Sequence, residues 1–259
     1  MKKQKFNFPT RAVIIIAIIF LAILLAIGYI WRILQSSGYF RIKDVIIRGQ
    51  ETPDLSYLKG RNIFSVDLER ESRFILNNCP ACDKIRLVRV LPDRIFVDFL
   101  RRRALALVKF YRNFAVDEQG VLFNAPEDIQ GLNLPVISGL ERKIFGPKPG
   151  TRYNIKELTL ALNLIKEIGR DSLLKHYYIS KIDVADPASA ALFISFPGTA
   201  AQGRRIIPLN LEVKFGQDNI RDKVAILAGM ISHERPELYN IKYIDLRFKE
   251  PVIKLKDAQ

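Results

Sequence analysis

The chain has 259 residues, of which 49% are hydrophobic and 26% charged, and this composition excludes a disordered protein and fits one or two packed domains. Lysine and arginine number 41 against 27 acidic residues, so the formal net charge of +14 favours anionic partners such as lipid headgroups, wall polymers or nucleic acid. Charge alone does not choose among these partners.

The first predicted element is a membrane-spanning helix. Ala12 to Ile30 is a run of 19 residues without a charge. At ~1.5 Å rise per residue this run nearly matches a hydrocarbon core of ~30 Å, so we expect a transmembrane helix over residues 12–31. A cleaved signal peptide is the competing interpretation, but its apolar region is normally shorter, at about 7 to 15 residues.

The flanks of this run predict its orientation. A basic tail, residues 1–11, precedes the run and contains no acidic residue, which predicts a cytoplasmic N-terminus and export of the chain beyond the helix. Tyr29 and Trp31 fit an aromatic belt at the outer interface. We therefore expect a single-pass protein of the plasma (inner) membrane whose larger part is extracytoplasmic.

The next segment predicts the order strand, helix, helix, strand, strand. Alternating apolar residues indicate the strands, and capping residues indicate where each helix begins. The expected elements are a strand at 40–48, a short helix capped by Thr52 with Pro53 at its start and Gly60 past its end, a helix from the N-cap Asp67 to Asn77, and a hairpin over 85–99 bent at Pro92 and Asp93.

Cys79 and Cys82 are the only cysteines and form a C-x-x-C pair between the second helix and the hairpin. A zinc site would need two more ligands, and His176 and His233 lie at no finger-like spacing. Asp83 occupies the position that a haem-attachment motif gives to histidine. Because a helix C-terminus disfavours a thiolate, a redox centre is not expected, and a local disulfide and two plain thiols both stay open.

The remaining sequence predicts a second region of strands with two helices. Short alternating segments separated by glycine and proline indicate the strands, and apolar residues at helical spacing indicate the helices. The expected elements are strands at 114–123 around a turn at Asp117 to Gly120, a strand at 134–139, a helix from the cap Asn154 to Gly169, two or three strands over 177–216, a helix at 218–234, and two strands over 241–255 bent at Glu250 and Pro251.

Three ordered passages resemble a POTRA domain beside a membrane anchor. They read F-x-I-x-x-V-x-I-x-G at 40–49, G-x-N-I-F-x-V-D at 60–67 and V-R-V-L-P-D-x-I-x-V at 88–97. Later passages resemble the FtsQ/DivIB family of bacterial division proteins, namely V-D-x-x-G-x-x-F at 116–123, L-P-x-I-x-G at 134–139 and Y-I-D-L-R-F at 243–248. The resemblance departs at 101–106, where R-R-R-A-L-A stands in place of E-R-x-P-x-A.

This resemblance implies an α+β fold. One N-terminal transmembrane helix would lead into a POTRA domain at 39–108, and a mostly antiparallel β domain with two helices would fill 109–256. In the family these domains form a non-enzymatic scaffold of the division complex at the septum. The terminal β strands receive a strand from a single-pass coiled-coil partner, FtsB or its counterpart DivIC, accompanied by FtsL, and the POTRA domain faces other divisome members.

The residues themselves favour binding over catalysis. None of the common hydrolase, phosphate-binding or dinucleotide-binding motifs occurs in the sequence, and no catalytic residue, cofactor or metal site is expected. Nucleic acid is hard to reconcile with export, and the basic residues lack the interleaved aromatics that stack bases. The basic run Arg101 to Arg103 is expected to be a solvated rim rather than a phosphate-binding site.

The C-terminal strands are the candidate binding site. A final strand with unpaired backbone groups can accept a partner strand, while its side chains give selectivity. The face of Ile244 and Leu246 is expected to be core. The candidate partner-binding residues are Tyr243, Asp245, Arg247, Phe248, Val252, Ile253, Lys254 and Leu255.

Two alternatives remain from the sequence. One is a POTRA chaperone of outer-membrane assembly or secretion, although such proteins usually carry tandem POTRA repeats or a barrel. The other is a membrane-tethered thiol oxidoreductase that would use Cys79 and Cys82.

Overall fold

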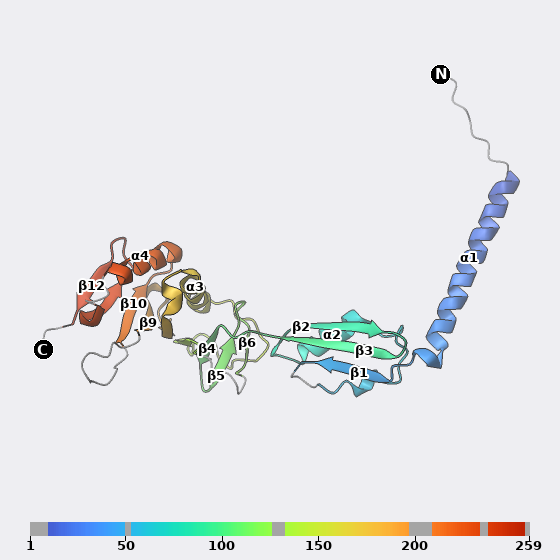
Figure 1. Cartoon of the computed structure of the whole chain (residues 1–259), viewed down its shortest axis with the longest axis horizontal. Helices are drawn as coiled ribbons and strands as arrows, with labels where there is room; N and C mark the ends of the chain where they lie inside the picture. The colour runs from blue at the N-terminus through green and yellow to red at the C-terminus, as the bar shows by residue number, and fades with distance from the viewer. Residues whose placement is uncertain (1–9, 50–52, 126–132, 197–208, 234–237, 257–259) are drawn as a thin grey trace, which may run out of the picture. The chain divides into compact units, whose positions relative to one another are not determined.

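The computed structural model describes residues 10–49, 53–125, 133–196, 209–233 and 238–256. The chain divides into two compact units, one comprising residues 1–78 and 82–100 and the other residues 79–81 and 101–259 (Figure 1). The change of unit near residue 100 comes earlier than the expected boundary at 108. The reason is that β4, Ala106–Lys109, pairs with strands of the second unit.

The N-terminal element is a long apolar helix, α1, Thr10–Ser36. An 18-residue window within its segment Val13–Ser36 has a mean hydropathy of 3.2, and α1 is the one helix among the described residues that is long and apolar enough to cross a membrane. The helix continues past the predicted end at residue 31. Residues 1–9 of the expected cytoplasmic tail lie outside the described residues.

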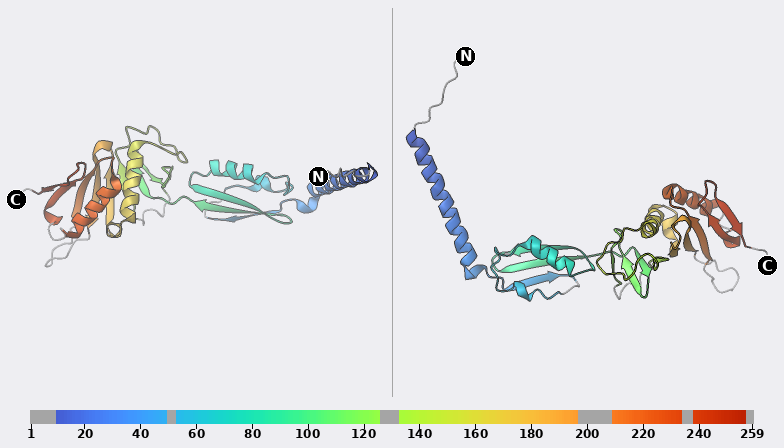
Figure 2. Two further views of the ribbon diagram at one scale, coloured as in Figure 1. Left: turned by 90° about the horizontal axis from the view of Figure 1, so that it is seen from above. Right: turned by 180° about the vertical axis from the view of Figure 1, so that it is seen from behind.

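The first unit places one helix against a three-stranded sheet, as the views in Figure 2 show. The strand order is β1-β3-β2, with β1 (Asp44–Arg48) parallel to β3 (Arg94–Arg101) and β2 (Cys82–Val90) joined to β3 in a hairpin. Helix α2 (Leu68–Asn77) buries Ile75 toward the sheet. As predicted, Asp67 caps this helix, because its carboxylate accepts from the N–H groups of Glu69 and Arg70.

The first predicted helix of this unit is reduced to a single 3-10 turn. This turn, η2, spans Ser56–Leu58, and the carboxylate of Asp54 accepts the N–H of Ser56 at its start. The buried residues Leu55 and Leu58 lie three apart, so one tight turn is enough to bury both. Gly60 follows with a φ of 81°, a left-handed conformation that ends the turn. The predicted cap, Thr52, lies outside the described residues.

The second unit is built on a nine-stranded, mostly antiparallel sheet. Its strand order is β12-β11-β10-β9-β8-β7-β4-β5-β6. The strands besides β4 are β5 (Asn113–Val116), β6 (Leu122–Asn124), β7 (Val136–Ser138), β8 (Tyr178–Asp183), β9 (Ala190–Phe196), β10 (Leu209–Phe215), β11 (Ile241–Asp245) and β12 (Val252–Leu255).

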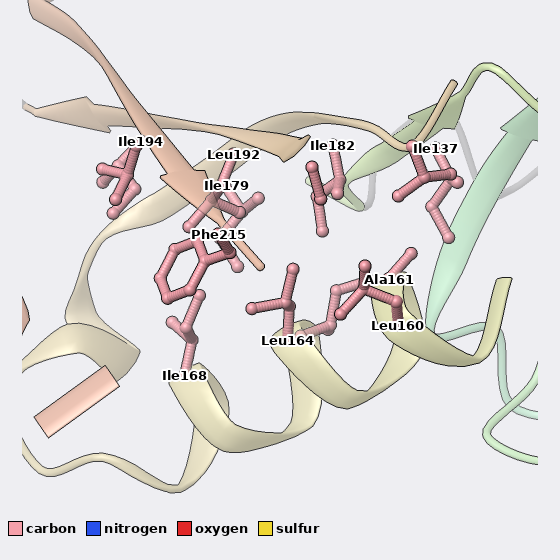
Figure 3. Packing of buried hydrophobic residues seen from close by; sticks show 14 of the residues in the cluster. Ile137, Leu160, Ala161, Leu164, Ile168, Ile179, Ile182, Leu192, Ile194 and Phe215 are labelled. Atoms are coloured by element: carbon pink, nitrogen blue, oxygen red, sulfur yellow. The ribbon is translucent and has the colours of Figure 1, made fainter. Parts of the chain in front are cut away.

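Two helices, α3 (Lys156–Arg170) and α4 (Ile220–His233), pack with the sheet to form the main core. Figure 3 shows the α3 side chains of Leu160, Leu164 and Ile168 pointing toward apolar residues of the strands, including Phe215. The predicted limits of α3 need correction. Its N-cap is Ile155 rather than Asn154 and makes no side-chain capping bond, and the helix continues through Gly169 to Arg170.

Candidate partner-binding edge

Strand β12 is the last strand of the sheet at its C-terminal end. Within the described part of the chain, β11 is its one strand neighbour in the sheet order. In an antiparallel pair, every second residue of an outer strand directs its N–H and C=O away from the neighbour. All four residues of β12 are exposed, with Val252 at 49%, Ile253 at 40% and Leu255 at 60%. The edge therefore offers both backbone groups and apolar side chains.

The register of β12 shows which face of the sheet its side chains occupy. Ile253 is opposite Ile244, which is fully buried, so the two share the core-facing side of the sheet. As expected, Leu246 is also buried. Strand period would place Phe248 on the same face, but its side chain is 59% exposed because β11 ends at Asp245 and the chain bends.

Asp245 and Arg247 form an internal ion pair. The guanidinium of Arg247 donates to both carboxylate oxygens of Asp245, the shortest contact being 2.6 Å, and also to the hydroxyl of Ser189 at 3.1 Å. Asp245 is only 4% exposed. The hydrogen bonds from Arg247 lower the pKa of the Asp245 carboxyl, although burial acts in the opposite direction. These two residues fix the bend after β11, and their charged groups are already engaged within the chain.

Tyr243 is half-buried and faces a neighbouring strand. The ammonium of Lys214, on β10, lies 4.3 Å from the centroid of the Tyr243 ring, a cation–π contact. Sequence reasoning missed both Lys214 and Ser189, because Lys214 contacts Tyr243 and Ser189 contacts Arg247 across long separations in the sequence. Of the eight candidate residues, six are exposed, namely Arg247, Phe248, Val252, Ile253, Lys254 and Leu255, and Arg247 is the one of these whose charge is paired within the chain.

The basic run after the hairpin is not simply a solvated rim. Arg102 donates to the carboxylate of Asp117 at 2.7 Å, with side-chain exposures of only 13% and 9%. Asp117 also accepts from the N–H groups of Gln119 and Val121, both at 2.9 Å. The expectation was therefore wrong for Arg102, whose charge stabilises the turn of the V-D-x-x-G passage.

The cysteines follow the helix as predicted, but the strand begins three residues before the expected residue 85 and includes Cys82. Cys79 follows Asn78, the C-cap of α2, and Cys82 is the first residue of β2 and fully buried. Both are disulfide-bonded in this structure. A position after a helix C-terminus lacks the positive dipole end that activates a nucleophilic thiolate.

Other chemistry-bearing groups are scattered. No group of three or more metal-ligating side chains forms among the described residues. His176 is exposed in the 3-10 turn η4, Leu174–His176, and His233 is the last residue of α4. A shallow groove beside α2 has Tyr57 in its wall. Burial and a hydrogen bond to Glu71 raise the pKa of Tyr57 to about 12.

This fold and site define a class, a membrane-anchored α+β protein that presents an open sheet edge. The model of the C-terminal domain of the cell division proteins FtsQ/DivIB matches residues 106–247, more than half of the chain. The chain therefore belongs to the FtsQ/DivIB family of cell division proteins. The expected family and the α+β architecture are both confirmed.

Individual relatives extend the similarity beyond this domain. The chain is 25% identical to a cell division protein FtsQ of Koribacter versatilis, covering 94% of this chain and 70% of the relative. It is also 25% identical to FtsQ of Syntrophotalea carbinolica, over 88% and 78% of the two chains. A cell division protein DivIB of Clostridium acetobutylicum is 26% identical over 84% of each chain.

Proposed function

We propose that this chain is a non-enzymatic scaffold of the division complex that binds other membrane division proteins through the edge of β12. The partners are single-pass coiled-coil proteins of the FtsB/DivIC and FtsL type, one of which adds a strand to the sheet. The scaffold links early and late division proteins and septal wall synthesis. In this proposal the N-terminus is cytoplasmic, both units are extracytoplasmic at the septum, and the first unit contacts further division proteins.

The observation that carries this proposal is the exposure of an entire outer strand. Soluble proteins normally protect a sheet edge, because unpaired backbone groups beside apolar side chains invite pairing with other chains. Here Val252, Ile253 and Leu255 stay exposed on such an edge. A partner strand would cover these side chains and satisfy the outward backbone groups.

The charges around the edge indicate what kind of strand would fit. Lys254 and Lys256 are exposed on and just after β12, and Lys249 is exposed in the preceding bend. Glu250 is the acidic residue in this stretch. A partner strand that alternates apolar and acidic residues would therefore complement the edge in both hydrophobicity and charge.

A binding titration tests the proposal. The detergent-solubilised full chain is mixed with a labelled FtsB-type or DivIC-type partner, and the Kd is compared with that of the variant I253D/L255D. We expect at least a tenfold weaker affinity, because two buried charges would face an apolar partner strand. The matched control is Phe145→Asp, which alters an apolar side chain that is 84% exposed outside β12 and should leave the Kd unchanged. An unaltered Kd in the β12 variant would remove the basis of this proposal.

A second experiment separates this proposal from its alternatives. Replacing both Cys79 and Cys82 by serine should leave division intact if the chain is a scaffold, and should abolish its function if the chain is a thiol oxidoreductase. Capture of membrane partners distinguishes the chaperone alternative. Coiled-coil single-pass proteins support the scaffold, whereas barrel proteins support assembly of outer-membrane components.

A further inference from the structure

The end of α1 is capped by a residue that is distant in the sequence. The side-chain amide of Asn62 donates to the carbonyl oxygens of Leu34 and Gln35, at 2.9 and 2.8 Å. Carbonyls in the last turn of a helix have no partner within the helix, so another group must satisfy them. A loop of the first unit thus completes the hydrogen bonding of the membrane helix.

Aromatic rings continue from the helix end into the same unit. The ring of Phe64 lies 6.3 Å from Trp31 of α1 and 5.1 Å from Phe40, and Tyr39 lies 5.3 Å from Phe40. Phe40 and Phe64 are half-buried in this cluster. Trp31 is 52% exposed and Tyr39 65% exposed, so the cluster ends in two amphipathic aromatic rings that reach the surface.

The loop that carries Asn62 and Phe64 is held in place from several directions. Arg89 of β2 donates to the carbonyls of Ile63 and Val66, at 2.9 and 2.7 Å. The N–H of Ile63 donates to the carbonyl of Phe40 at 2.8 Å, and the side chain of Ile63 is fully buried. The N–H of Phe64 donates to the side-chain oxygen of Asn62, which orients the amide toward the helix. Contacts within the first unit therefore hold the loop in this conformation without any contribution from lipid.

The length of α1 places this cluster at the membrane surface. The helical segment Val13–Ser36 has 24 residues, which at ~1.5 Å per residue is about 36 Å and exceeds a hydrocarbon core of ~30 Å. The last turn of α1 thus reaches the interfacial layer, where tryptophan and tyrosine are enriched. Arg32 and Arg41, which follow Trp31 and Phe40 in the sequence, are both exposed and suit the phosphates of the headgroups.

We propose that Trp31, Tyr39, Phe40, Asn62 and Phe64 form an interfacial collar that inserts into the lipid headgroup layer at the end of α1. The collar sets the orientation of the first unit against the bilayer. The headgroup layer is the surface that the collar contacts, since Trp31 belongs to the helix that crosses this layer and Asn62 and Phe64 contact that helix. This inference assigns a role to Asn62 and Phe64 of the G-x-N-I-F-x-V-D passage, to which the proposed scaffold function assigns none.

Depth-dependent quenching of tryptophan fluorescence tests the collar. The chain contains a single tryptophan, so the variant W31F/F64W moves the only fluorophore into the loop. The full chain is reconstituted in vesicles of phosphatidylcholine and phosphatidylglycerol that contain lipids brominated near the headgroup or deep in the acyl chain. We expect the shallow lipid to quench F64W emission at least twofold more than the deep lipid does.

A matched variant on α2 is the control. Phe74 is 56% exposed in the same unit and is not part of the collar, so neither brominated lipid should quench W31F/F74W. Circular dichroism confirms that each variant is folded, and W31F/F40W supplies a second position in the collar if F64W disturbs packing. Equal quenching at positions 64 and 74, or none at positions 40 and 64, would overturn the proposal.

The role of Asn62 as a positioning residue is tested in the same background. Adding Asn62→Ala should lower the shallow quenching of F64W at least twofold, because the loop loses its hydrogen bonds to the helix end. Asn78→Ala is the matched control, since the amide of Asn78 donates to the carbonyl of Phe74 near the C-terminus of α2. The quenching of F64W should not change in that control. If Asn62→Ala also leaves it unchanged, Asn62 does not position the collar.

Discussion

The two edges of the nine-stranded sheet differ in how far the chain itself covers them. At one end, β6 exchanges backbone hydrogen bonds with the segment Gly150–Arg152, because Gly150 donates to the carbonyl of Leu122 at 2.7 Å and Leu122 donates to that of Thr151 at 3.1 Å. Leu122 and Phe123 are almost completely buried there. At the other end, β12 is exposed along its whole length.

The covered edge at β6 shows that an irregular segment of this chain can pair with an outer strand of the sheet. The same chain that covers β6 with its own backbone leaves β12 accessible across the described residues. The open edge is also short, and Pro251 and Lys254 limit pairing with another copy of itself. The edge of β12 is thus accessible, while its own residues limit its pairing with a second copy of the chain. Both properties fit the proposal that β12 receives a strand from a different protein.

The largest effect on folding is expected at Asp117, in the turn that leads into β6. Asp117→Ala removes the acceptor for two backbone N–H groups and leaves the buried guanidinium of Arg102 without its carboxylate. We expect a loss of about 3 kcal/mol in the free energy of unfolding. Urea unfolding of the detergent-solubilised chain measures it. Glu118→Ala, at the exposed next residue, should change the value by less than ~0.5 kcal/mol.

The next largest loss of stability is expected from a substitution at Gly120, near the covered edge at β6. Its φ is 81°, and a Cβ there would lie 2.9 Å from the carbonyl oxygen of Tyr153, whose N–H donates to the carbonyl of Gly120. Gly120→Ala should therefore destabilise the chain by about 2 kcal/mol. Gly169→Ala is the contrasting control, because Gly169 lies in α3 with nothing near its Cβ position. That substitution should raise stability by ~0.5 to 1 kcal/mol, and a loss in both variants would contradict the explanation.

Sequence reasoning identified the local features of both edges and missed the long-range ones. The turn at Asp117 to Gly120, the N-cap Asp67 and the buried face of Ile244 each follow from residues close together in the chain. The covering of β6 by Gly150–Arg152 could not be predicted, because an irregular segment has no hydrophobic period.

Two predictions about side-chain exposure were wrong because the side chains bind residues elsewhere in the same chain. Arg102 lies in a basic run that is typical of a solvated surface, and its partner Asp117 is 15 residues away. Asp245 and Arg247 look like outward-facing residues of one strand, yet β11 ends between them and Ser189 supplies a third group. Strand period predicts faces only as far as the strand extends.

The ion pair before the open edge predicts a pH dependence. Because Arg247 lowers the pKa of Asp245, the pair contributes stability above the ordinary carboxyl pKa of about 3.9 and loses it as the pH falls through the lowered value. Arg247 is one-third exposed, so we expect only about 1 kcal/mol. Asp245→Asn should lower stability at pH 7 and reduce the fall between about pH 5 and 2, measured by urea unfolding. Asp218→Asn, at an exposed site, should retain the wild-type profile.

The smallest effect on folding is expected in β12 itself, where the effect on binding should be greatest. Ile253 and Leu255 are already 40% and 60% exposed, so I253D/L255D should change the free energy of unfolding by less than ~0.5 kcal/mol while it weakens partner binding. Urea unfolding and the binding titration, performed on the same preparation, separate the two quantities. A destabilisation close to that of Asp117→Ala would mean that β12 is part of the folding core, and the weaker binding would then follow from unfolding. Near wild-type stability with weak binding would instead mean that the open edge contributes little to the fold and is available to a partner.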